Sequence, residues 1–261
     1  MAMLRKLGEI IGGFVFSLAF GFLIVFVALA NFTQYDTLHP IVTNLIEGQL
    51  TGNVTQNQLD FLYRNLTEQC KTSSTAIVPL DTNNQAELKC DDVKNSDSSG
   101  ITHLIAKGLF DQIYYKKYEC SFVECVREVV FANISDAKEN QKFSILVSSK
   151  ANEFFTSNQI FLIITIILGV VLIIISVRVW YNILKVIGIT LLLVGITYLF
   201  IPTIKTQVAK MTEGQNILTI LDTLFAPITK MLQISLILGI VFTTIGYVTA
   251  YLMDKPEKKK N

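Results

Sequence analysis

Four cysteines are the residues of this chain with the most distinctive chemistry. Cys70, Cys90, Cys120 and Cys125 all lie in one polar block and are separated by 19, 29 and 4 residues. Four thiolates can hold a zinc ion, but these spacings lack the paired C-x-x-C motifs of zinc sites. An even number of cysteines outside the cytoplasm instead predicts two disulfide bonds.

The residues around the last two cysteines favour one of the three pairings that four cysteines allow. Ser121-Phe-Val-Glu124 matches a capping box, which makes Ser121 the N-cap of a helix. Cys120 and Cys125 then take the N′ and N4 positions, whose side chains touch at a helix start. We therefore predict a Cys120–Cys125 disulfide, which leaves Cys70 to pair with Cys90.

The remaining polar residues form no recognisable reaction centre. His39 and His103 have no cysteine or carboxylate at ligand spacing. The segment 95–100 resembles the start of a calcium-binding loop, but the twelfth position of that loop is Ala106, where a bidentate glutamate is needed. The sequence therefore predicts no catalytic residue, no cofactor and no metal site.

Asn-x-Ser/Thr tripeptides, the acceptor pattern for N-glycosylation, occur in and beside the polar block. The one at Asn31 borders an apolar run, too close to a membrane for modification. Asn53, Asn65 and Asn133 are the candidate glycosylation sites. In a block this rich in Asn, Ser and Thr such tripeptides also arise by chance, so the pattern is weak evidence.

Long apolar runs flank the polar block, at 10–30, 160–177, 183–201 and 232–253. About 20 such residues cross the hydrocarbon core as a helix, and a backbone in lipid must satisfy its own hydrogen bonds. The sequence thus predicts an all-α membrane protein with four transmembrane helices and a mostly helical, disulfide-bonded extracytoplasmic domain between the first two. Small residues recur at helix-packing spacing: Gly8/Gly12, Gly13/Ser17/Gly21 and Ser235/Gly239.

Basic residues indicate the orientation, because Lys and Arg accumulate in cytoplasmic connections. They lie before the first run, around the turn between the second and third, and after the fourth: Arg5, Lys6, Arg178, Lys185, Lys255, Lys258, Lys259 and Lys260. We therefore predict a multi-pass cell-membrane protein with cytoplasmic N- and C-termini. Its parts are 1–30 (N-terminus and first span), 31–158 (extracytoplasmic domain), 159–202 (helical hairpin), 203–231 (outer amphipathic loop helix), 232–253 (fourth span) and 254–261 (basic tail).

The first apolar run has a second interpretation. Arg5-Lys6, an apolar run and Ala28-Leu29-Ala30 are also typical of a secretory signal with a small-residue cleavage site. The run is longer than the ~7–15 residues of a signal core, which favours a retained helix. Cleavage would leave three spans with their orientation unchanged.

Periodicity predicts mostly helices in the outer parts. An apolar stripe at 38–46 predicts a helix with Pro40 in its first turn, and a capping box at Thr55–Gln58 opens a second. Further helices are predicted at 101–117 and from Ser121, with a loop over 71–100 that has room for one short strand at 76–80. In the second outer loop, the apolar stripe at 217–228 predicts an amphipathic helix, on the outer membrane surface or packed under the outer domain, and Pro227 precedes the fourth span.

Charge limits the class of function. The block 31–158 has 11 Lys/Arg against 16 Asp/Glu, so it offers no basic surface for nucleic acid. No charged residue lies deep in a span, where ion and proton pathways usually keep one. We expect a non-enzymatic protein in the lipid bilayer whose outer domain binds a protein partner, self-associates or supports an assembly. The alternative is a small pore or transporter with an uncharged path lined by Thr165, Ser176, Thr190 and Thr197.

In outline, four spans with disulfides in a large first outer loop resemble the claudin type of cell-junction protein. The tryptophan-rich signature of that loop is absent, because the one tryptophan is Trp180. Tetraspanins place their large loop between spans 3 and 4, and their Cys-Cys-Gly motif is also missing. We assign no family from the sequence.

Overall fold

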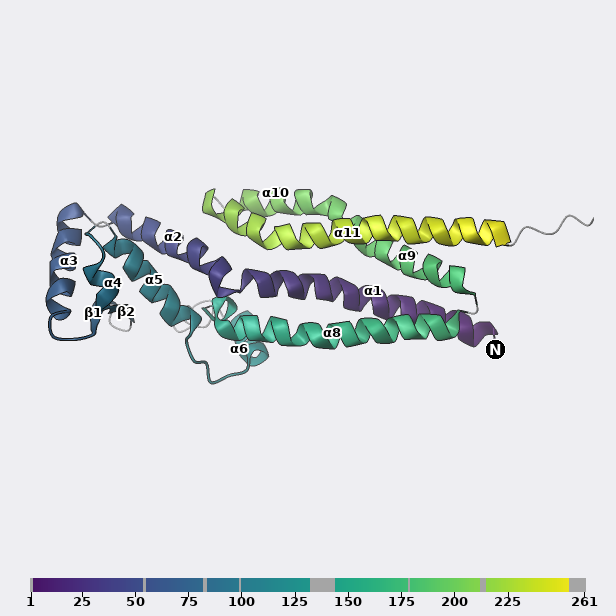
Figure 1. Cartoon of the computed structure of the whole chain (residues 1–261), viewed down its shortest axis with the longest axis horizontal. Helices are drawn as coiled ribbons and strands as arrows, with labels where there is room; N and C mark the ends of the chain where they lie inside the picture. Colours follow the sequence, from purple (N-terminus) through teal and green to yellow (C-terminus); the bar gives the residue numbers. More distant parts are fainter. Residues whose placement is uncertain are drawn as a thin grey trace, which may run out of the picture. The chain divides into compact units, whose positions relative to one another are not determined.

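Residues 2–53, 55–81, 84–98, 100–131, 144–177, 179–211 and 215–253 are described by the computed structural model of the chain (Figure 1). The chain divides into two compact units. The membrane unit comprises Met1–Asn31 and Phe155–Asn261, and the polar unit comprises Phe32–Phe154. The polar unit is therefore a single insertion in the sequence of the membrane unit.

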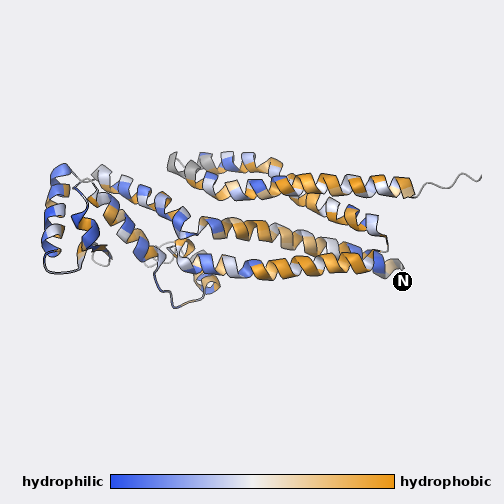
Figure 2. Ribbon diagram, in the orientation of Figure 1, coloured by the Kyte–Doolittle hydropathy of each residue, from blue (hydrophilic) through white to orange (hydrophobic). Residues whose placement is uncertain are grey.

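Long apolar helices make up the membrane unit. They are α1 (Ala2–Phe32), α8 (Ser149–Ser176), α9 (Trp180–Ile196), the 3-10 turn η2 (Thr197–Phe200), α10 (Ile201–Met211) and α11 (Gln215–Met253). Within the described residues, four stretches are long and apolar enough to cross a membrane: Arg5–Phe32, Ser149–Ser176, Trp180–Val208 and Ile220–Met253. The predicted four apolar helices are confirmed, and Figure 2 shows hydrophobic residues along most of their length.

Glycines bring the antiparallel helices α9 and α11 into backbone contact. A Cβ added at Gly188 would stand 2.5 Å from the nitrogen of Thr243, and one at Gly195 would stand 2.5 Å from that of Leu236. From the other side, a Cβ at Gly239 would stand 2.6 Å from a backbone nitrogen of α9. These contacts recur every three or four residues along each helix, so a line of small residues joins the two helices along one face, as is common in membranes. We call this line the glycine seam.

Helix α1 meets α8 in a similar way. A Cβ at Gly169 of α8 would stand 3.0 Å from the nitrogen of Phe16, and one at Gly12 would stand 3.1 Å from that of Ile173. Beside these contacts, Phe16, Ile173 and Leu191 form a buried apolar cluster that joins α1, α8 and α9. Three helices of the membrane unit therefore share one core.

Two prolines that we expected near helix starts lie well inside helices. Pro227 is inside α11, which runs unbroken from Gln215 to Met253, so the prediction of a separate loop helix ending before the fourth span is wrong. Phe225 and Ile228, on either side of this proline, pack against one apolar cluster, so tertiary contacts lie on both sides of the missing hydrogen bond. Pro40 lies beyond the first turn of α2 (Tyr35–Asn53), which begins earlier than predicted.

The polar unit is built from short helices and one hairpin. After α2 come α3 (Gln56–Gln69), β1 (Thr75–Asp81), β2 (Asn84–Lys89), α4 (Cys90–Lys94), α5 (Ile101–Tyr114), α6 (Phe122–Phe131) and the 3-10 turn η1 (Ser144–Val147). One apolar cluster joins α3, the hairpin, α4 and α5. A second joins Leu38 of α2 to Phe110 and Tyr114 of α5. The unit is mostly helical, as predicted.

The hairpin corrects the prediction of a loop over 71–100. β1 and β2 pair antiparallel, with Ala76 opposite Leu88 and Val78 opposite Ala86. These four side chains are buried, and the residues between them are polar or lie at the surface. The alternation has the two-residue period of a strand, but alanines and few β-branched residues give it a weak signal.

Candidate functional site

The Cys70–Cys90 disulfide fastens the β-hairpin to α3. Cys70 follows the last residue of α3, and Cys90 is the first residue of α4. Their Cα atoms are 5.3 Å apart, within the usual range for a disulfide, and both side chains are buried. The bond closes the chain segment that contains both strands, so it restrains the hairpin against the helix that it packs on.

The second disulfide, Cys120–Cys125, lies at the start of α6. The Cα atoms of this pair are 5.6 Å apart. Beside it, the N–H of Ser121 donates to the Glu124 carboxylate at 2.9 Å, and the N–H of Glu124 donates to the Ser121 hydroxyl at 3.3 Å. Hydrogen bonds from the Ser121 side chain and backbone hold the pKa of the Glu124 carboxyl below its ordinary value. The capping box and the covalent bond therefore act on the same helix start.

The free edge of β1 is covered by side chains of its own unit. The N–H of Cys90 donates to the Ser74 carbonyl, so the backbone groups of Thr75, Ile77 and Pro79 point away from β2. The Gln69 amide accepts from the N–H of Ile77 at 2.9 Å and donates to its carbonyl at 3.4 Å. The Ser73 hydroxyl donates to the Thr75 carbonyl, and a proline has no N–H to offer. Strand addition at this edge is therefore blocked.

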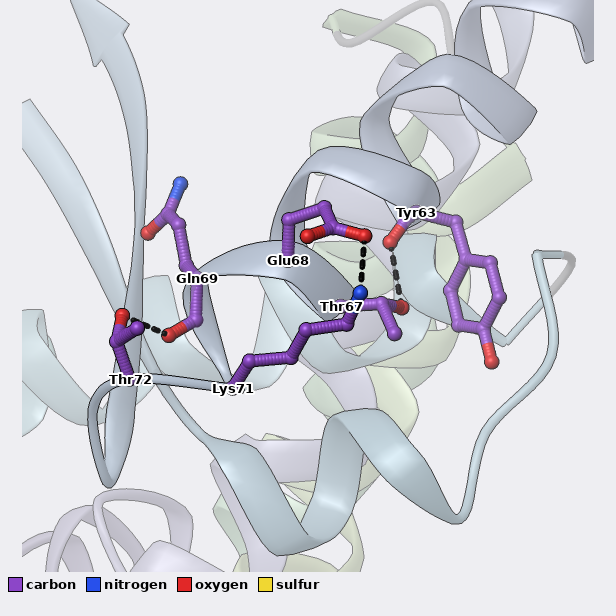
Figure 3. Close-up of polar contacts among 6 residues, drawn as sticks. All are labelled: Tyr63, Thr67, Glu68, Gln69, Lys71 and Thr72. Carbon is purple, nitrogen blue, oxygen red and sulfur yellow. Dashed lines mark hydrogen bonds and ion pairs between the residues drawn. The ribbon is translucent and has the colours of Figure 1, made fainter.

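Helix α3 is held firmly and presents one face to solvent. Figure 3 shows how its last turns are fixed: the Thr67 hydroxyl donates to the Tyr63 carbonyl at 2.8 Å, and the Thr72 hydroxyl donates to the Gln69 carbonyl at 3.2 Å. Lys71 and Glu68 form an ion pair at 2.5 Å. Both of its side chains are exposed, so it adds little stability.

Four exposed residues at helical spacing define what we call the α3 outer face: Phe61, Arg64, Asn65 and Glu68. Phe61 is 73% exposed although it is a large aromatic residue, and the rest of its helix contributes Leu59 and Leu66 to the core. Aromatic residues and arginine dominate the binding energy of protein interfaces. This face therefore combines two residue types, an aromatic residue and an arginine, that are frequent in protein interfaces.

A small polar cavity of 110 Å³ lies between β2, α4 and α5. Carboxylates and ammonium groups line it: Glu87, Asp92, Asp111, Lys89 and Lys107. Its volume is below the ~300 Å³ of typical ligand pockets. Asp111 also accepts a hydrogen bond from the Tyr35 hydroxyl at 2.6 Å, so part of this charge supports the fold.

The two histidines lie apart, each in its own setting. His39 packs against the rings of Tyr35 and Phe110, and its Nε2 atom is buried without a hydrogen bond in the described structure. His103 faces the Glu47 carboxylate at 3.2 Å. No group of three His, Cys, Asp or Glu side chains that could hold a metal occurs among the described residues.

The structure describes the three candidate glycosylation sites to different extents. Asn65 is exposed on the α3 outer face, where an attached glycan would project into solvent. Asn53 is the last residue of α2, with its side chain outside the description. Asn133 lies outside the described residues altogether. All three remain candidates for modification.

The threonines proposed to line a pore bond to their own helices. The hydroxyls of Thr165 and Thr197 donate to the carbonyls of Phe161 at 2.9 Å and Val194 at 2.6 Å. Thr190 donates to carbonyls one turn earlier in α9. These hydroxyls therefore already use their donors within the helix.

Sequence reasoning missed the α3 outer face and the covered strand edge. Phe61 interrupts the polar side of α3, and an aromatic residue at a polar position was the signal that could have revealed this surface. Comparison of the chain with protein-family models, curated proteins and solved structures finds no match.

Proposed function

We propose that the chain is a multi-pass cell-membrane protein of non-enzymatic type, with both termini in the cytoplasm and the polar unit outside. The basic residues near the helix ends support this orientation. The cysteine pairs support it as well, because disulfides persist on the oxidising side of a membrane.

A reagent for exposed amines that does not cross membranes would test the orientation on intact cells. Lys71 and Lys6 both have exposed side chains, and they belong to different units. We expect modification of Lys71 and protection of Lys6, measured by mass spectrometry of tryptic peptides. Modification of Lys6 with protection of Lys71 would reverse the orientation.

The function that we propose for the polar unit is binding of a protein partner through the α3 outer face. The observation that carries this proposal is the exposed Phe61 beside Arg64 on a helix fixed by the Cys70–Cys90 disulfide. A surface fixed before binding loses little conformational freedom when a partner docks, and this favours affinity. Because the β1 edge is covered, the partner is expected to use side-chain contacts rather than strand addition.

Photo-crosslinking in native membranes tests this proposal. Phe61 is replaced by p-benzoylphenylalanine, and the matched control carries the same substitution at Tyr115, an aromatic residue of the polar unit that is 60% exposed. We expect a defined cross-linked product from position 61 that is weak or missing from position 115. A product of twice the chain mass would identify self-association as the form of binding.

Equal cross-linking from both positions, or none from position 61, would contradict the α3 outer face as the binding surface. The charge-reversing variant Arg64→Glu provides an independent check, since it should reduce the yield from position 61 without changing thermal stability. Glycosylation of Asn65 would cover the same face, so the yield should rise in cells that lack N-glycosylation.

The alternative function, an uncharged pore, is separated by a flux assay. The purified chain is reconstituted into liposomes and release of small ions and neutral solutes is followed. We expect no flux above that of empty liposomes, because α9 and α11 meet along the glycine seam and the hydroxyls of Thr190 and Thr197 are bonded within their helix. Flux without a partner would replace the binding proposal.

A further inference from the structure

An apolar groove of 410 Å³ opens between α1 and α9 of the membrane unit. Its lining includes Glu9, Gly13 and Ser17 of α1, and Val186, Thr190 and Leu193 of α9. This volume is within the range of pockets that bind small molecules. Ile10 and Phe14 also line the groove, and their side chains are exposed.

Two small residues on α1 create the groove. A Cβ at Gly13 would stand 3.4 Å from Thr190 Cγ2 and 3.6 Å from Val186 Cγ1, which is ordinary contact. The helices are therefore close together, and the hollow exists because Gly13 and Ser17 fill so little space. The small residue of the next turn, Gly21, is outside the lining, so the groove ends near Ser17.

The length of the groove along α1 is close to the hydrocarbon thickness of one leaflet of a bilayer. It begins at Glu9, the residue before the charge-free run 10–30, and continues to Ser17. Eight residues of helix rise about 12 Å, and one leaflet contributes about half of the hydrocarbon core, which is about 30 Å thick. An acyl chain lies within a single leaflet, so a groove of this length is sufficient for one chain.

The charges at the mouth of the groove identify the kind of headgroup. Glu9 lines the mouth, is half-buried, and has no ion pair in the described structure. Arg5 and Lys6 are exposed one helical turn away, towards the aqueous side. One carboxylate beside two cations is complementary to a zwitterion that carries an ammonium group and a phosphate.

We propose that this groove binds one glycerophospholipid with a primary-amine headgroup. An acyl chain occupies the space beside Gly13 and Ser17, the ammonium donates to the Glu9 carboxylate, and the phosphate lies against Arg5 and Lys6. A primary ammonium has three N–H donors, whereas the quaternary ammonium of a choline headgroup has none. The proposal rests on insertion of α1 and α9 in a bilayer and is independent of the α3 outer face.

Native mass spectrometry of the full chain tests the proposal. The chain is purified in mild detergent, delipidated, and mixed with phosphatidylethanolamine, phosphatidylcholine or phosphatidylglycerol that carry the same acyl chains. We expect retention of one phosphatidylethanolamine, with about tenfold preference over phosphatidylcholine, the effect of one charge-assisted hydrogen bond. Glu9→Gln should remove this preference while chain binding persists.

Variants that fill the groove test the acyl-chain part. Ser17→Leu should abolish lipid retention, and Gly21→Leu is the matched control because nothing lies within 4 Å of a Cβ at that position. If Ser17→Leu fails to fold, Gly13→Ala takes its place, since its methyl group makes only ordinary contacts, and it should weaken retention severalfold.

Unchanged retention in both groove variants would overturn the proposal. Equal retention of all three headgroups by the wild-type chain, or a preference that Glu9→Gln leaves intact, would overturn the assignment of the headgroup. A dimer without lipid that Ser17→Leu dissociates would assign the groove to a second copy of the chain instead.

Discussion

Helices of the membrane unit approach backbone to backbone at glycines, beside their apolar clusters, whereas helices of the polar unit meet through large side chains alone. At the glycine seam the backbones of α9 and α11 touch. In the polar unit, Leu66, Ile101, Ile105 and Phe110 fill the space between elements. The difference follows from the solvent. In water, burial of apolar area drives packing, but lipid tails are as apolar as leucine, so helices in a membrane gain mainly from close fit.

The two units also differ in the bonds that stabilise them. The polar unit adds two disulfides and hydrogen-bonded helix starts, because a small domain with a small core gains much from restraints on its unfolded state. The membrane unit depends on complementary shape along its seams. Substitutions should therefore damage the two units in different ways, and this can be measured.

The largest effect is expected from Gly195→Leu in the glycine seam. Even a Cβ at this position would stand 2.5 Å from backbone of α11, so leucine must separate the two helices. We expect a loss of more than about 3 kcal/mol, enough to prevent a stable bundle. The measurement is the fraction of monodisperse protein that survives heating in mild detergent. Gly21→Leu is the control, and equal heat resistance of the two variants would refute the seam.

The next effect is expected from the disulfides of the polar unit. Removal of Cys70–Cys90 by a double serine substitution should cost about 3 kcal/mol, and removal of Cys120–Cys125 about 2 kcal/mol, because the first closes a longer loop. Thermal unfolding followed by circular dichroism measures both. A larger loss from the second pair would contradict this order, and peptide mapping that links Cys70 to Cys120 or Cys125 would contradict the pairing.

A smaller, pH-dependent effect is expected at Tyr35. Burial and the hydrogen bond to Asp111 raise the pKa of its hydroxyl above the ordinary value. Because the folded state favours the protonated form, this stabilisation is complete below the unfolded pKa of about 10 and is lost as the pH rises above it. Tyr35→Phe should lower stability at neutral pH by about 1 kcal/mol and lessen the alkaline loss.

Unfolding midpoints of the wild type and Tyr35→Phe between pH 7 and 11 measure this effect. The gap between the two proteins should close as the pH rises. A constant gap would show that the pKa of this hydroxyl is the same in the folded and unfolded states, so that Tyr35 contributes nothing that depends on pH.

The smallest effect is expected in the membrane unit, at a hydrogen bond between α11 and α9. The Ser235 hydroxyl is buried and donates to the Leu191 carbonyl at 2.8 Å. Such bonds between membrane helices average about 0.6 kcal/mol, so Ser235→Ala should lower heat resistance only slightly. A loss comparable to that of Gly195→Leu would mean that polar bonding, rather than close fit, holds this unit together.

The parts of the fold that the sequence predicts are those with a strong local signal. Long apolar runs identify the four membrane helices, and Ser121 with Glu124 identifies the start of α6. The glycine seam was only partly predicted. The sequence pattern includes Gly239, but Gly188 and Gly195 are seven residues apart and do not match the four-residue spacing. Their role becomes visible only where α11 contacts both of them. Gly21 fits a packing pattern in sequence and meets nothing within 4 Å.

The candidate site shows the same limit. Whether Gln69 covers a strand edge depends on where Ile77 lies in three dimensions, and no spacing along the chain contains that information. Pro227 is a helix breaker by local chemistry, yet packing of Phe225 and Ile228 outweighs the lost hydrogen bond. Tertiary contacts therefore decide the features that local patterns predict incorrectly.

The length of α11 has a mechanical consequence. Its 39 residues extend about 58 Å, nearly twice the hydrocarbon thickness of about 30 Å. Part of this helix must therefore extend beyond the hydrocarbon core of a bilayer. The ion pair of Lys205 with Asp222 joins that part to α10. Pro227 removes one backbone hydrogen bond from α11, so a force on the N-terminal end of this helix would bend it at Pro227 before it separates α11 from α9 at Gly239.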